Sequence, residues 1–443
     1  MYKDKKIFIV GLARSGYEVA KVLLNYTNNI VLVDENENDE HIKELESLGV
    51  KVIIADRTKQ GDYLDESFDL VVKNPGAPLN VSSALKAEAL NIPIINEVEV
   101  AYNLLPKDIK IIAVTGSNGK TTTTQIIYEI LKSANLPVLL GGNIGTPVSA
   151  LLKDVKEDSI LVLEVSSHQL VNISQFKADI SIFTNLSEVH LDFFGTYDRY
   201  INTKKRIFNN HDENNIAIIN GINEDVVMIT SDIPSQKITF GDENHNLYIK
   251  NEKIYYDEKE IIFVKDIKLS GRHNYENMMC AIAVAKEFDV DNDTIKNVLA
   301  EFGGVEHRQE LVREYNGRFF YNDSKSTNVV STITALDAFK MPISLLLGGV
   351  DRGHSFEKLK PHLENVERVL CYGEIKNKIK EFFDSLGIEC LVFDNLEEAT
   401  KEAFKLSREN SVILLSPACG SWDQYSSFEE RGNEFKRVVN DLE

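Results

Sequence analysis

The chain is poor in the features that mark secreted and membrane-spanning proteins. Its four cysteines are scattered with no paired spacing, at Cys280, Cys371, Cys390 and Cys419. This usage argues against a disulfide framework or a zinc site and favours a reducing compartment. No apolar run reaches the roughly 18–20 residues that span a bilayer, and the first residues lack the apolar core and cleavage site of a signal peptide. We therefore expect a cytoplasmic protein without membrane insertion.

Positive charge is also scarce. The 49 lysines and arginines are outnumbered by 69 aspartates and glutamates, which gives a formal net charge of −20. Nucleic-acid binding needs a basic surface, so we expect no nucleic-acid partner. A phosphate-handling enzyme of this charge must gather its cations locally. The remaining composition, 43% hydrophobic and 27% charged, is that of a soluble globular protein.

Short apolar runs alternate with amphipathic stretches, which indicates parallel α/β sheets. In the first part of the chain the expected strands are residues 7–10, 30–33, 50–55, 70–72 and 92–95, and the expected helices are 14–26 and 41–48. In the second part the expected strands are 111–114, 160–165 and 179–185, a helix follows residue 120, and further helices are expected at 197–210, 275–288 and 294–302. Residues 247–264 predict a small antiparallel region.

The last part of the chain again predicts an α/β arrangement. Asn316-Gly317 between two alternating apolar runs is a strong hairpin signal. The strands expected after it are 343–347, 368–371, 390–393 and 412–415, and the helices are 329–339, 355–365, 375–386 and 396–407. With 443 residues, too many for one core, we expect three domains, at residues 1–100, 101–305 and 306–443.

The most specific motif is a heptapeptide, Thr-Gly-Ser-Asn-Gly-Lys-Thr, that joins an apolar strand to a helix. This is the sequence form of a phosphate-binding loop. Gly116 and Gly119 let the backbone approach phosphate oxygens, Lys120 supplies a cation, and the Thr121 hydroxyl can ligate Mg²⁺. The general pattern has another glycine five positions before Gly119, where this chain has valine. The alternative is a simple glycine turn before an ordinary helix. The combination of a strand, a turn, Gly-Lys-Thr and a helix argues against it.

Polar side chains follow two further strands. Glu164 ends the run 160–165 and can hold Mg²⁺ directly or through water, although a helix-capping Glu/Ser cluster is the alternative. His190 and Asp192 follow the next strand, where a metal-shell role is favoured over a purely structural histidine. The carboxyl ends of parallel strands share one edge of a sheet, and catalytic residues gather there.

Three other motifs are less specific. Residues 204–206, Lys-Lys-Arg, have the composition of a solvated helix face. Asp323 and Lys325 lie two apart after the hairpin, which suits a nucleotide or an acyl-phosphate, or else a plain polar loop. Residues 11–16, with Asp34 at the end of the next strand, form a dinucleotide-type turn without the middle glycine. This turn supports a phosphate or nucleotide at a helix N-terminus, not specifically NAD.

These motifs resemble the Mur ligase family in order and spacing. The resemblance rests on the following segments: residues 115–121, 164–167, 185–192, 271–277, 307–310 and 322–328. Residues 416–432 are similar to the members that add D-glutamate. The match covers the whole chain.

The resemblance implies an ATP-dependent amide ligase of peptidoglycan synthesis. We separately expect a monomer whose partners are its small-molecule substrates. Its fold would be α/β with a Rossmann-like N-terminal domain, a central P-loop ATPase-like domain with a mostly parallel sheet, and a Rossmann-like C-terminal domain. These would hold UDP-N-acetylmuramoyl-L-alanine, ATP and D-glutamate in turn. Phosphorylation of the alanine carboxylate would give an acyl-phosphate, which the glutamate amine attacks through a tetrahedral intermediate, leaving ADP and phosphate.

The resemblance also implies roles for individual residues. ATP binding is implied for Gly116, Ser117, Asn118, Gly119, Lys120, Thr121, Thr122, Asn274, Asn277, Arg308 and Asp323. UDP-substrate binding is implied for Gly11, Arg14, Ser15, Asp34 and Asn143, and D-glutamate binding for Thr327, Arg352, Ser421 and Phe428. Catalytic roles are implied for Lys120, His190, Lys204 and Lys325, and metal binding for Thr121, Glu164, His190 and Lys204.

The family changes the interpretation of Lys204. Its members carry a carbamylated lysine that holds the second of two Mg²⁺ ions, with Mn²⁺ as an alternative metal, and the Lys-x-Arg-Ile pattern places this lysine at Lys204. Lys205 is the adjacent alternative. A carbamate turns a cation into an oxygen ligand, which Mg²⁺ requires. Arg352 stands near where some members use lysine on the glutamate, so the contact to the glutamate side chain stays open.

Competing functions explain fewer residues. A nicotinamide dehydrogenase accounts for residues 11–16 but not for Gly119-Lys120-Thr121. A switch GTPase needs Asn-Lys-x-Asp, whereas Asn377-Lys378 is followed by Ile-Lys. A sister ligase of the same pathway or a folylpolyglutamate synthase is closer, but the latter should lack the N-terminal domain. A non-catalytic UDP-binding regulator would not need the set Lys120, Glu164 and His190.

Overall fold

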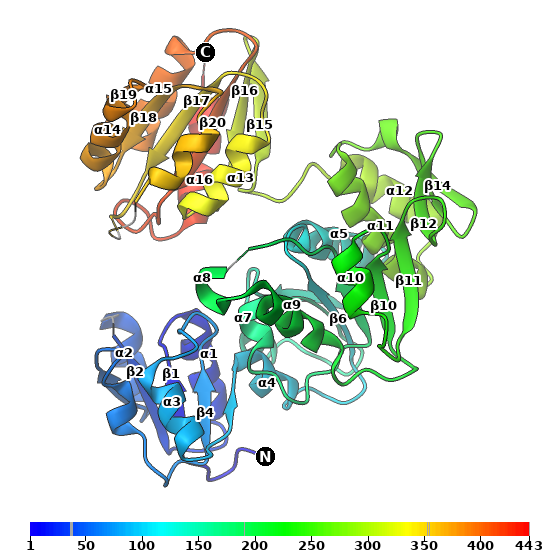
Figure 1. The fold of residues 1–443 in the computed structure, drawn as a ribbon, viewed down its shortest axis with the longest axis vertical. Coiled ribbons are helices and arrows are strands. Elements are labelled where there is room, and N and C mark those ends of the chain that lie inside the picture. The colour runs from blue at the N-terminus through cyan, green and yellow to red at the C-terminus, as the bar shows by residue number, and fades with distance from the viewer. Residues whose placement is uncertain (36–38, 190, 352, 354, 443) are drawn as a thin grey trace. The chain divides into compact units, whose positions relative to one another are not determined.

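The computed structural model describes residues 1–35, 39–189, 191–351, 353 and 355–442. The chain divides into two compact units, Met1–Phe302 and Gly303–Glu443. The described residues form three sheets, two in the first unit and one in the second (Figure 1). This confirms the predicted α/β class, while the domain boundaries after residues 100 and 305 stay predictions. No helix of the described ranges is both long enough and apolar enough to cross a membrane.

The first sheet is parallel throughout, in the order β3-β2-β1-β4-β5. Its strands are β1 (Ile7–Val10), β2 (Ile30–Asp34), β3 (Lys51–Ile54), β4 (Leu70–Lys73) and β5 (Ile94–Ile95). Its helices are α1 (Arg14–Leu23), α2 (Asp39–Ser47), η1 (Gln60–Tyr63) and α3 (Ser82–Ala89). Every residue of β1 is buried, as expected for a central strand covered on both faces.

The second sheet has the order β14-β13-β12-β11-β10-β9-β6-β8-β7. Its strands are β6 (Lys110–Thr115), β7 (Val138–Gly142), β8 (Ile160–Glu164), β9 (Ile180–Phe183), β10 (Ile216–Asn220), β11 (Gln236–Gly241), β12 (Leu247–Lys250), β13 (Lys253–Tyr256) and β14 (Lys259–Phe263). The pairs β12–β13 and β13–β14 are antiparallel and the rest parallel. The predicted antiparallel region is therefore confirmed.

Helices cover this second sheet and carry most of the predicted site. They are α4 (Glu97–Tyr102), α5 (Lys120–Ser133), α6 (Val148–Leu151), α7 (Ser167–Leu170), α8 (Leu191–Phe194), α9 (Tyr197–Lys205), η2 (Arg206–Phe208), α10 (Glu224–Ile229), η3 (Val264–Asp266), α11 (Arg272–Glu287) and α12 (Asn292–Glu301). The phosphate-binding loop lies between β6 and α5, at the carboxyl end of a strand that β9 and β8 flank.

Helix α4 connects the first sheet to the second and is tied to the second by buried carboxylates. Glu97 accepts a hydrogen bond from the backbone N–H of Ser149, and burial raises the pKa of Glu97 to about 7. Glu99 accepts three hydrogen bonds from the backbone N–H groups of residues 174–176, at 2.6–3.1 Å. Both side chains are at most 2% exposed. These hydrogen bonds therefore anchor helix α4 to segments that flank the second sheet.

The third sheet belongs to the second unit and has the order β15-β16-β20-β17-β18-β19. Its strands are β15 (Glu310–Tyr315), β16 (Arg318–Asn322), β17 (Ile343–Gly348), β18 (Val366–Tyr372), β19 (Glu389–Val392) and β20 (Ser411–Ala418). Its helices are α13 (Val329–Asp337), η4 (Glu357–His362), α14 (Lys376–Ser385), α15 (Leu396–Leu406) and α16 (Phe428–Asn440). The β15–β16 hairpin turns at Asn316 and Gly317, with φ of 47° and 71°, as the sequence predicts.

One predicted helix is shorter than expected and is not a regular α-helix. A helix was expected at residues 355–365, and the structure has a 3₁₀ helix over Glu357–His362 with Pro361 inside it. Proline has no N–H group to donate and its ring crowds the preceding turn, so a regular α-helix is disfavoured here. The helix expected at 14–26 also ends earlier, at Leu23.

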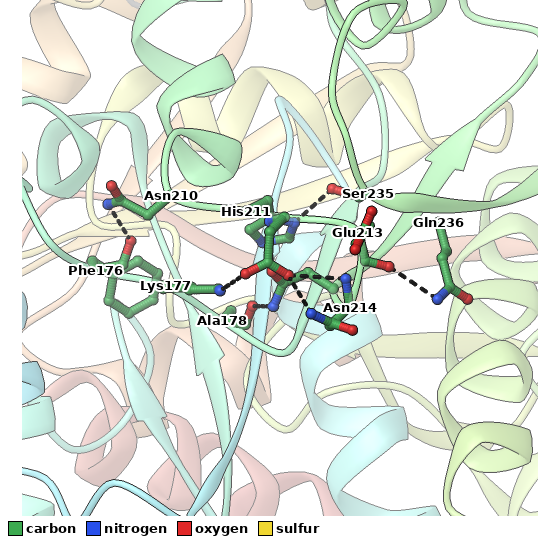
Figure 2. A network of polar contacts seen from close by, with 11 residues as sticks. Phe176, Lys177, Ala178, Asn210, His211, Glu213, Asn214, Ser235 and Gln236 are labelled. Atoms are coloured by element: carbon green, nitrogen blue, oxygen red, sulfur yellow. Dashed lines mark hydrogen bonds and ion pairs between the residues drawn. The ribbon is translucent and has the colours of Figure 1, made fainter.

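A polar network fixes the segment after η2, between helix α9 and strand β10 (Figure 2). The His211 ring bridges two hydroxyls, Ser181 Oγ at 2.9 Å from Nε2 and Ser235 Oγ at 2.8 Å from Nδ1. Beside it, Lys177 and Asp212 form an ion pair at 2.5 Å. Burial, and to a smaller extent the Lys177 cation, lower the pKa of His211 to about 4. The network anchors the segment that follows α9 and η2, and α9 carries Lys204.

We expect His211 to make the fold sensitive to acid. The unfolded chain binds a proton at this residue near pH 6.5, and the folded chain only near pH 4, so stability falls as the pH drops through this window. The loss is at most about 3 kcal/mol. His211→Gln retains a donor and an acceptor but does not titrate, so its melting temperature should fall less between pH 7.5 and 5.0.

The control for this experiment is the surface variant His362→Gln, whose parent side chain pairs with Asp337. Differential scanning calorimetry at both pH values gives the comparison. An identical pH response in the parent and in His211→Gln would contradict the assignment.

Candidate active site

The phosphate-binding loop adopts a backbone that only glycine tolerates at two positions. Gly116 and Gly119 have φ of 148° and 80°. A Cβ atom at Gly116 would lie 1.9 Å from Thr184 Oγ1, and one at Gly119 would lie 2.3 Å from Asn277 Oδ1. Gly119 is also the N-cap of α5 and makes no side-chain cap. The motif glycines are thus required both by conformation and by close packing.

Side chains after β9 hold the loop from one side. The backbone carbonyl oxygen of Asn185 accepts a hydrogen bond from the Ser117 N–H at 2.9 Å. The side-chain Oδ1 of Asn185 accepts one from the Asn118 N–H, also at 2.9 Å. Thr184 Oγ1 donates to the Asn118 carbonyl at 2.6 Å. Two of the predicted ATP-binding residues therefore use their N–H groups within the protein. The first turn of α5, from Lys120 to Thr122, has N–H groups with no acceptor inside the helix, as at any helix start, and these suit an anion.

Lys120 folds back over the loop. Its Nζ donates to the carbonyl oxygens of Gly116 and Ser117, each at 2.9 Å. Both of these acceptors are neutral backbone oxygens, and Lys120 is the first residue of α5. This is a cation within the loop that is expected to receive phosphate oxygens.

Thr121 and Glu164 form the oxygen-rich side of the site. Thr121 Oγ1 donates to Glu164 Oε2 at 2.6 Å, and Glu164 Oε1 accepts from Asn143 Nδ2 at 2.7 Å. Glu164 ends β8 and is 3% exposed. Asn143, predicted as a UDP-substrate residue, thus lies against the predicted metal ligand, a placement that the sequence did not indicate.

Lys204 reaches the same loop from α9. Its Nζ donates to the Gly116 carbonyl at 2.7 Å and to Thr115 Oγ1 at 3.3 Å, and the residue is 1% exposed. Lys120 and Lys204 therefore donate to the same carbonyl oxygen. Burial, and then the charge of Lys120, lower the pKa of Lys204 well below its ordinary value, against the opposing pull of Glu164.

The neighbouring residues separate Lys204 from Lys205. Lys205 Nζ pairs with Asp232 at 2.7 Å on the surface, away from the loop carbonyl that Lys204 contacts. Tyr200, one turn before Lys204, places its ring 5.1 Å from the ammonium and its hydroxyl 2.9 Å from Ser117 Oγ. The geometry thus favours Lys204 over Lys205 as the functional lysine, and it overturns the solvated helix face that composition alone suggested for this position.

The donor set suits magnesium only in part. Thr121 and Glu164 offer hard oxygen atoms, which Mg²⁺ prefers. No group of three or more histidine, cysteine, aspartate or glutamate side chains within the described residues is arranged to hold a metal. His190, a predicted ligand and catalytic residue, lies outside the described residues. A carbamate on Lys204 would add the oxygen atoms that the set lacks.

Helix α11 closes the loop from another side. Asn277 Oδ1 accepts from Thr123 Oγ1 at 3.2 Å, across the contact with α5. Asn274 lies one turn earlier and donates to the Ser270 carbonyl at 2.8 Å. The structure therefore brings the predicted ATP residue Asn277 to the phosphate-binding loop. Asn274 shares its helix.

A separate cavity of about 210 Å³ lies at the carboxyl edge of the first sheet. Gly11 and Asp34, both predicted to bind the UDP substrate, line it. Asp34 Oδ2 accepts the backbone N–H of Leu12 at 2.5 Å, so this carboxylate also holds the turn. Arg57, which the sequence did not single out, lines the cavity and pairs with Glu35 at 2.5 Å. Arg14 and Ser15 open α1 after this turn.

In the second unit, the predicted ATP residue Asp323 follows β16. Asp323 is 2% exposed and accepts hydrogen bonds from Ser416 Oγ at 2.7 Å and from the Gln309 N–H at 3.2 Å. Burial raises the pKa of Asp323 to about 6, and these bonds oppose the rise. Arg308, beside Gln309, is exposed. The predicted nucleotide residues of this unit thus gather at the carboxyl ends of β16 and β20.

The predicted D-glutamate residues lie on two loops of the same edge. Thr327 and Lys325 follow Asp323, and the Lys325 Nζ lies 6.0 Å from the Phe428 ring. Ser421 is buried after β20, and Phe428 starts α16. Arg352 lies outside the described residues, so its predicted contact stays a prediction. Thr327, Ser421 and Phe428 therefore lie at the same edge of the third sheet, and their binding to D-glutamate stays a prediction.

Comparison with known proteins identifies the relatives. Family models match residues 114–285 as "Mur ligase middle domain", 307–419 as "Mur ligase, glutamate ligase domain" and 7–67 as "TrkA-N domain". A Geobacillus protein (strain WCH70) named UDP-N-acetylmuramoylalanine–D-glutamate ligase is 42% identical over 448 residues, covering 100% of this chain and 98% of its own. The chain belongs to the Mur ligase family. A Listeria monocytogenes protein (serotype 4b, strain F2365) of the same name is 40% identical over 449 residues, with the same coverage.

Solved Mur ligase structures share the fold of this Mur ligase at lower identity. UDP-N-acetylmuramate-alanine ligase MurC from Thermotoga maritima has a TM-score of 0.59 and 21% identity, over 98% of this chain and 99% of its own. MurF ligase from the same organism, solved in complex with ADP, has a TM-score of 0.52 and 18% identity, over 99% and 96%. At these identities the likeness shows the fold alone.

Proposed function

We propose that this Mur ligase joins D-glutamate to the L-alanine carboxylate of UDP-N-acetylmuramoyl-L-alanine, with ATP converted to ADP and phosphate. The observation that carries the proposal is the loop between β6 and α5, where Lys120, Thr121, Glu164 and Lys204 converge. Full-length similarity to relatives named for this activity supports the choice of substrates. The reaction is a cytoplasmic step of peptidoglycan synthesis.

The chemistry needs activation because a carboxylate is a poor electrophile. In the first step a carboxylate oxygen of the alanine attacks the γ-phosphorus of ATP, and the bond to the β–γ bridging oxygen breaks, which releases ADP. In the second step the neutral amine of D-glutamate attacks the acyl carbon. The tetrahedral intermediate then expels phosphate, and the amine loses a proton. Two anions must meet in the first step, so local cations are essential.

The residues of the loop fit this task. Lys120 and the N–H groups of the first turn of α5 would bind the phosphates and orient them. Thr121 and Glu164 would hold Mg²⁺, which when bound neutralises charge on the phosphate oxygens. Asn277 would contact the nucleotide beside Gly119. In the second unit, Asp323 and Arg308 would complete nucleotide binding, and Lys325 would approach the phosphates.

Lys204 would serve as a carbamate. Its amine is buried, and a depressed pKa favours the neutral form that attacks CO₂. The nitrogen forms a bond to the carbon of CO₂ and releases one proton, which leaves an anionic carbamate. This change replaces a buried cation beside Lys120 with an anion whose oxygen atoms can ligate a second Mg²⁺. His190 would belong to the same metal shell.

The two other substrates would bind elsewhere. The cavity lined by Gly11 and Asp34, with Arg14 and Ser15 on the adjacent helix, would hold the UDP group. Asn143, which contacts Glu164, suits the other end of this long substrate, where the alanine carboxylate reacts. Thr327, Ser421 and Phe428 would bind D-glutamate. We infer a monomer with only small-molecule partners and no nucleic acid.

Substrate choice is tested by measuring phosphate release from ATP with UDP-N-acetylmuramoyl-L-alanine and a panel of amino acids. We expect D-glutamate to exceed L-glutamate, L-alanine and a diamino acid by at least about a hundredfold in kcat/KM, because a site that pairs buried polar groups discriminates strongly. Mass spectrometry of the product should show one added glutamyl residue.

The control for the panel replaces the acceptor with UDP-N-acetylmuramate, which lacks the alanine. Preference for L-alanine on that acceptor, or for a diamino acid on a longer one, would assign the chain to a sister step. No phosphate release with any acceptor would favour a binding role without catalysis.

A further inference from the structure

Arg431 is an arginine without exposed surface in the second unit. It lies on α16, one turn after Phe428, and is 0% exposed. Among the residues that the structure describes, its guanidinium forms no ion pair. A buried charge is costly unless it is hydrogen-bonded. The position therefore needs an explanation, and none of the roles implied by the family resemblance involves this residue.

Four hydrogen bonds join the guanidinium to backbone and hydroxyl oxygens at three strand ends. Nε donates to Ser324 Oγ at 3.0 Å and Nη2 to the Ser324 carbonyl at 2.9 Å. Nη1 donates to the Cys419 carbonyl at 3.1 Å and to the Gly348 carbonyl at 3.4 Å. A planar guanidinium with five donors is suited to bind several oxygen atoms at once.

These acceptors lie on the loops that carry the proposed glutamate residues. Ser324 directly precedes Lys325 and comes three residues before Thr327, and Cys419 comes two residues before Ser421. Ser324 Oγ in turn donates to the Phe428 carbonyl at 2.8 Å, which ties the first loop to the start of α16. One side chain therefore connects all three segments from which the proposed glutamate contacts Thr327, Ser421 and Phe428 come.

We propose that Arg431 is a positioning residue for D-glutamate binding. Its side chain fixes the positions of residues 324–327 and 419–421 relative to each other, so that both loops contact the same D-glutamate molecule. This inference rests on the proposed function. Arg431 does not touch the substrate in this proposal but acts through Ser324 and Cys419. The positive charge in the core of the site would also favour a substrate with two carboxylates.

The test compares Arg431→Met and Arg431→Lys with the parent. We expect Arg431→Met to raise the KM for D-glutamate at least about tenfold, because loop displacements near 1 Å cost this much or more. The KM values for ATP and for UDP-N-acetylmuramoyl-L-alanine should stay within about threefold of the parental values. Arg431→Lys keeps the charge but loses the fork, so it should recover only part of the loss.

The matched control is Arg437→Gln, on the same helix. Arg437 is exposed and pairs with Glu397 at 2.7 Å. This variant should keep the parental KM for D-glutamate. Circular dichroism and melting temperature check that each variant is folded.

A binding measurement separates positioning from general loss of stability. Trp422 is the only tryptophan in the chain and directly follows Ser421, so its fluorescence reports on the second loop. The parent is first given a non-hydrolysable analogue of ATP and UDP-N-acetylmuramoyl-L-alanine. Addition of D-glutamate should then change the fluorescence of Trp422. In Arg431→Met the midpoint of the titration should move to at least about tenfold higher D-glutamate, in line with the KM.

The outcomes distinguish the two proposals. If the parent neither uses D-glutamate nor responds to it, the proposed function fails. If the parent responds and folded Arg431→Met keeps the parental KM and midpoint, the positioning role fails. The positioning role also fails if all three KM values rise together, or if Arg431→Met is unfolded and the folded Arg431→Lys binds D-glutamate like the parent.

Discussion

Replacing Lys120 with alanine is expected to lower kcat by at least about a thousandfold, because the charge that neutralises the phosphates in the transition state is lost. The fold should tolerate the change. The hydrogen bonds of Lys120 Nζ to the carbonyls of Gly116 and Ser117 lie on a loop that Asn185 and Thr184 hold independently. Steady-state phosphate release and the melting temperature measure the two effects separately.

Lys132→Ala is the matched control for Lys120→Ala. Lys132 lies in the last turn of the same helix, and its Nζ is 5.3 Å from the Tyr128 ring. It should retain the parental kcat. Lys120→Arg keeps a cation of different shape and should stay strongly impaired. A kcat close to the parental value in folded Lys120→Ala would refute the assignment of this loop as the reactive phosphate site.

Replacing Lys204 with alanine is expected to lower kcat by about a hundredfold to a thousandfold, and a short carboxylic acid should restore part of the loss. Formate or acetate can place two oxygen atoms where the carbamate would lie. Loss of a direct ligand should cost more than the roughly 10–100-fold that loss of an outer-shell partner costs. Activity is measured as phosphate release across a series of acid concentrations at constant ionic strength.

The choice of rescuing compound decides what Lys204 does. If the side chain acts as an ammonium, ethylamine should rescue Lys204→Ala and acetate should not. If it acts as a carbamate, the order reverses. Lys205→Ala is the control, because Lys205 pairs with Asp232 on the surface, and it should keep most of the parental activity. Failure of every carboxylic acid to restore turnover counts against the carbamate.

Local motifs made much of this architecture predictable. Gly116 and Gly119 indicate a loop, because few other residues tolerate the positive φ angles at these positions. Asn316-Gly317 predicts a hairpin turn for the same reason. The apolar runs of β6 and β8 predict strands covered on both faces. In each case a few neighbouring residues determine the conformation.

Other features depend on contacts between distant parts of the sequence. Lys204 looks like a surface lysine until α9 places it 2.7 Å from the Gly116 carbonyl, 88 residues away. Arg431 shows no sign of burial in its own segment, Glu-Glu-Arg-Gly, because its partner Ser324 lies 107 residues earlier. Sequence spacing gives no access to such long-range pairs.

The carbonyl oxygen of Gly116, which accepts hydrogen bonds from both Lys120 and Lys204, couples two chemical events. The carbamate proposed at Lys204 would place an anion beside the cation of Lys120, and by thermodynamic reciprocity each of the two charges would stabilise the other to the same extent. The carbamate proposed at Lys204 would make dissolved CO₂ an effector of this ligase. The fraction of competent enzyme would then depend on the carbon dioxide supply of the cell as well as on its ATP.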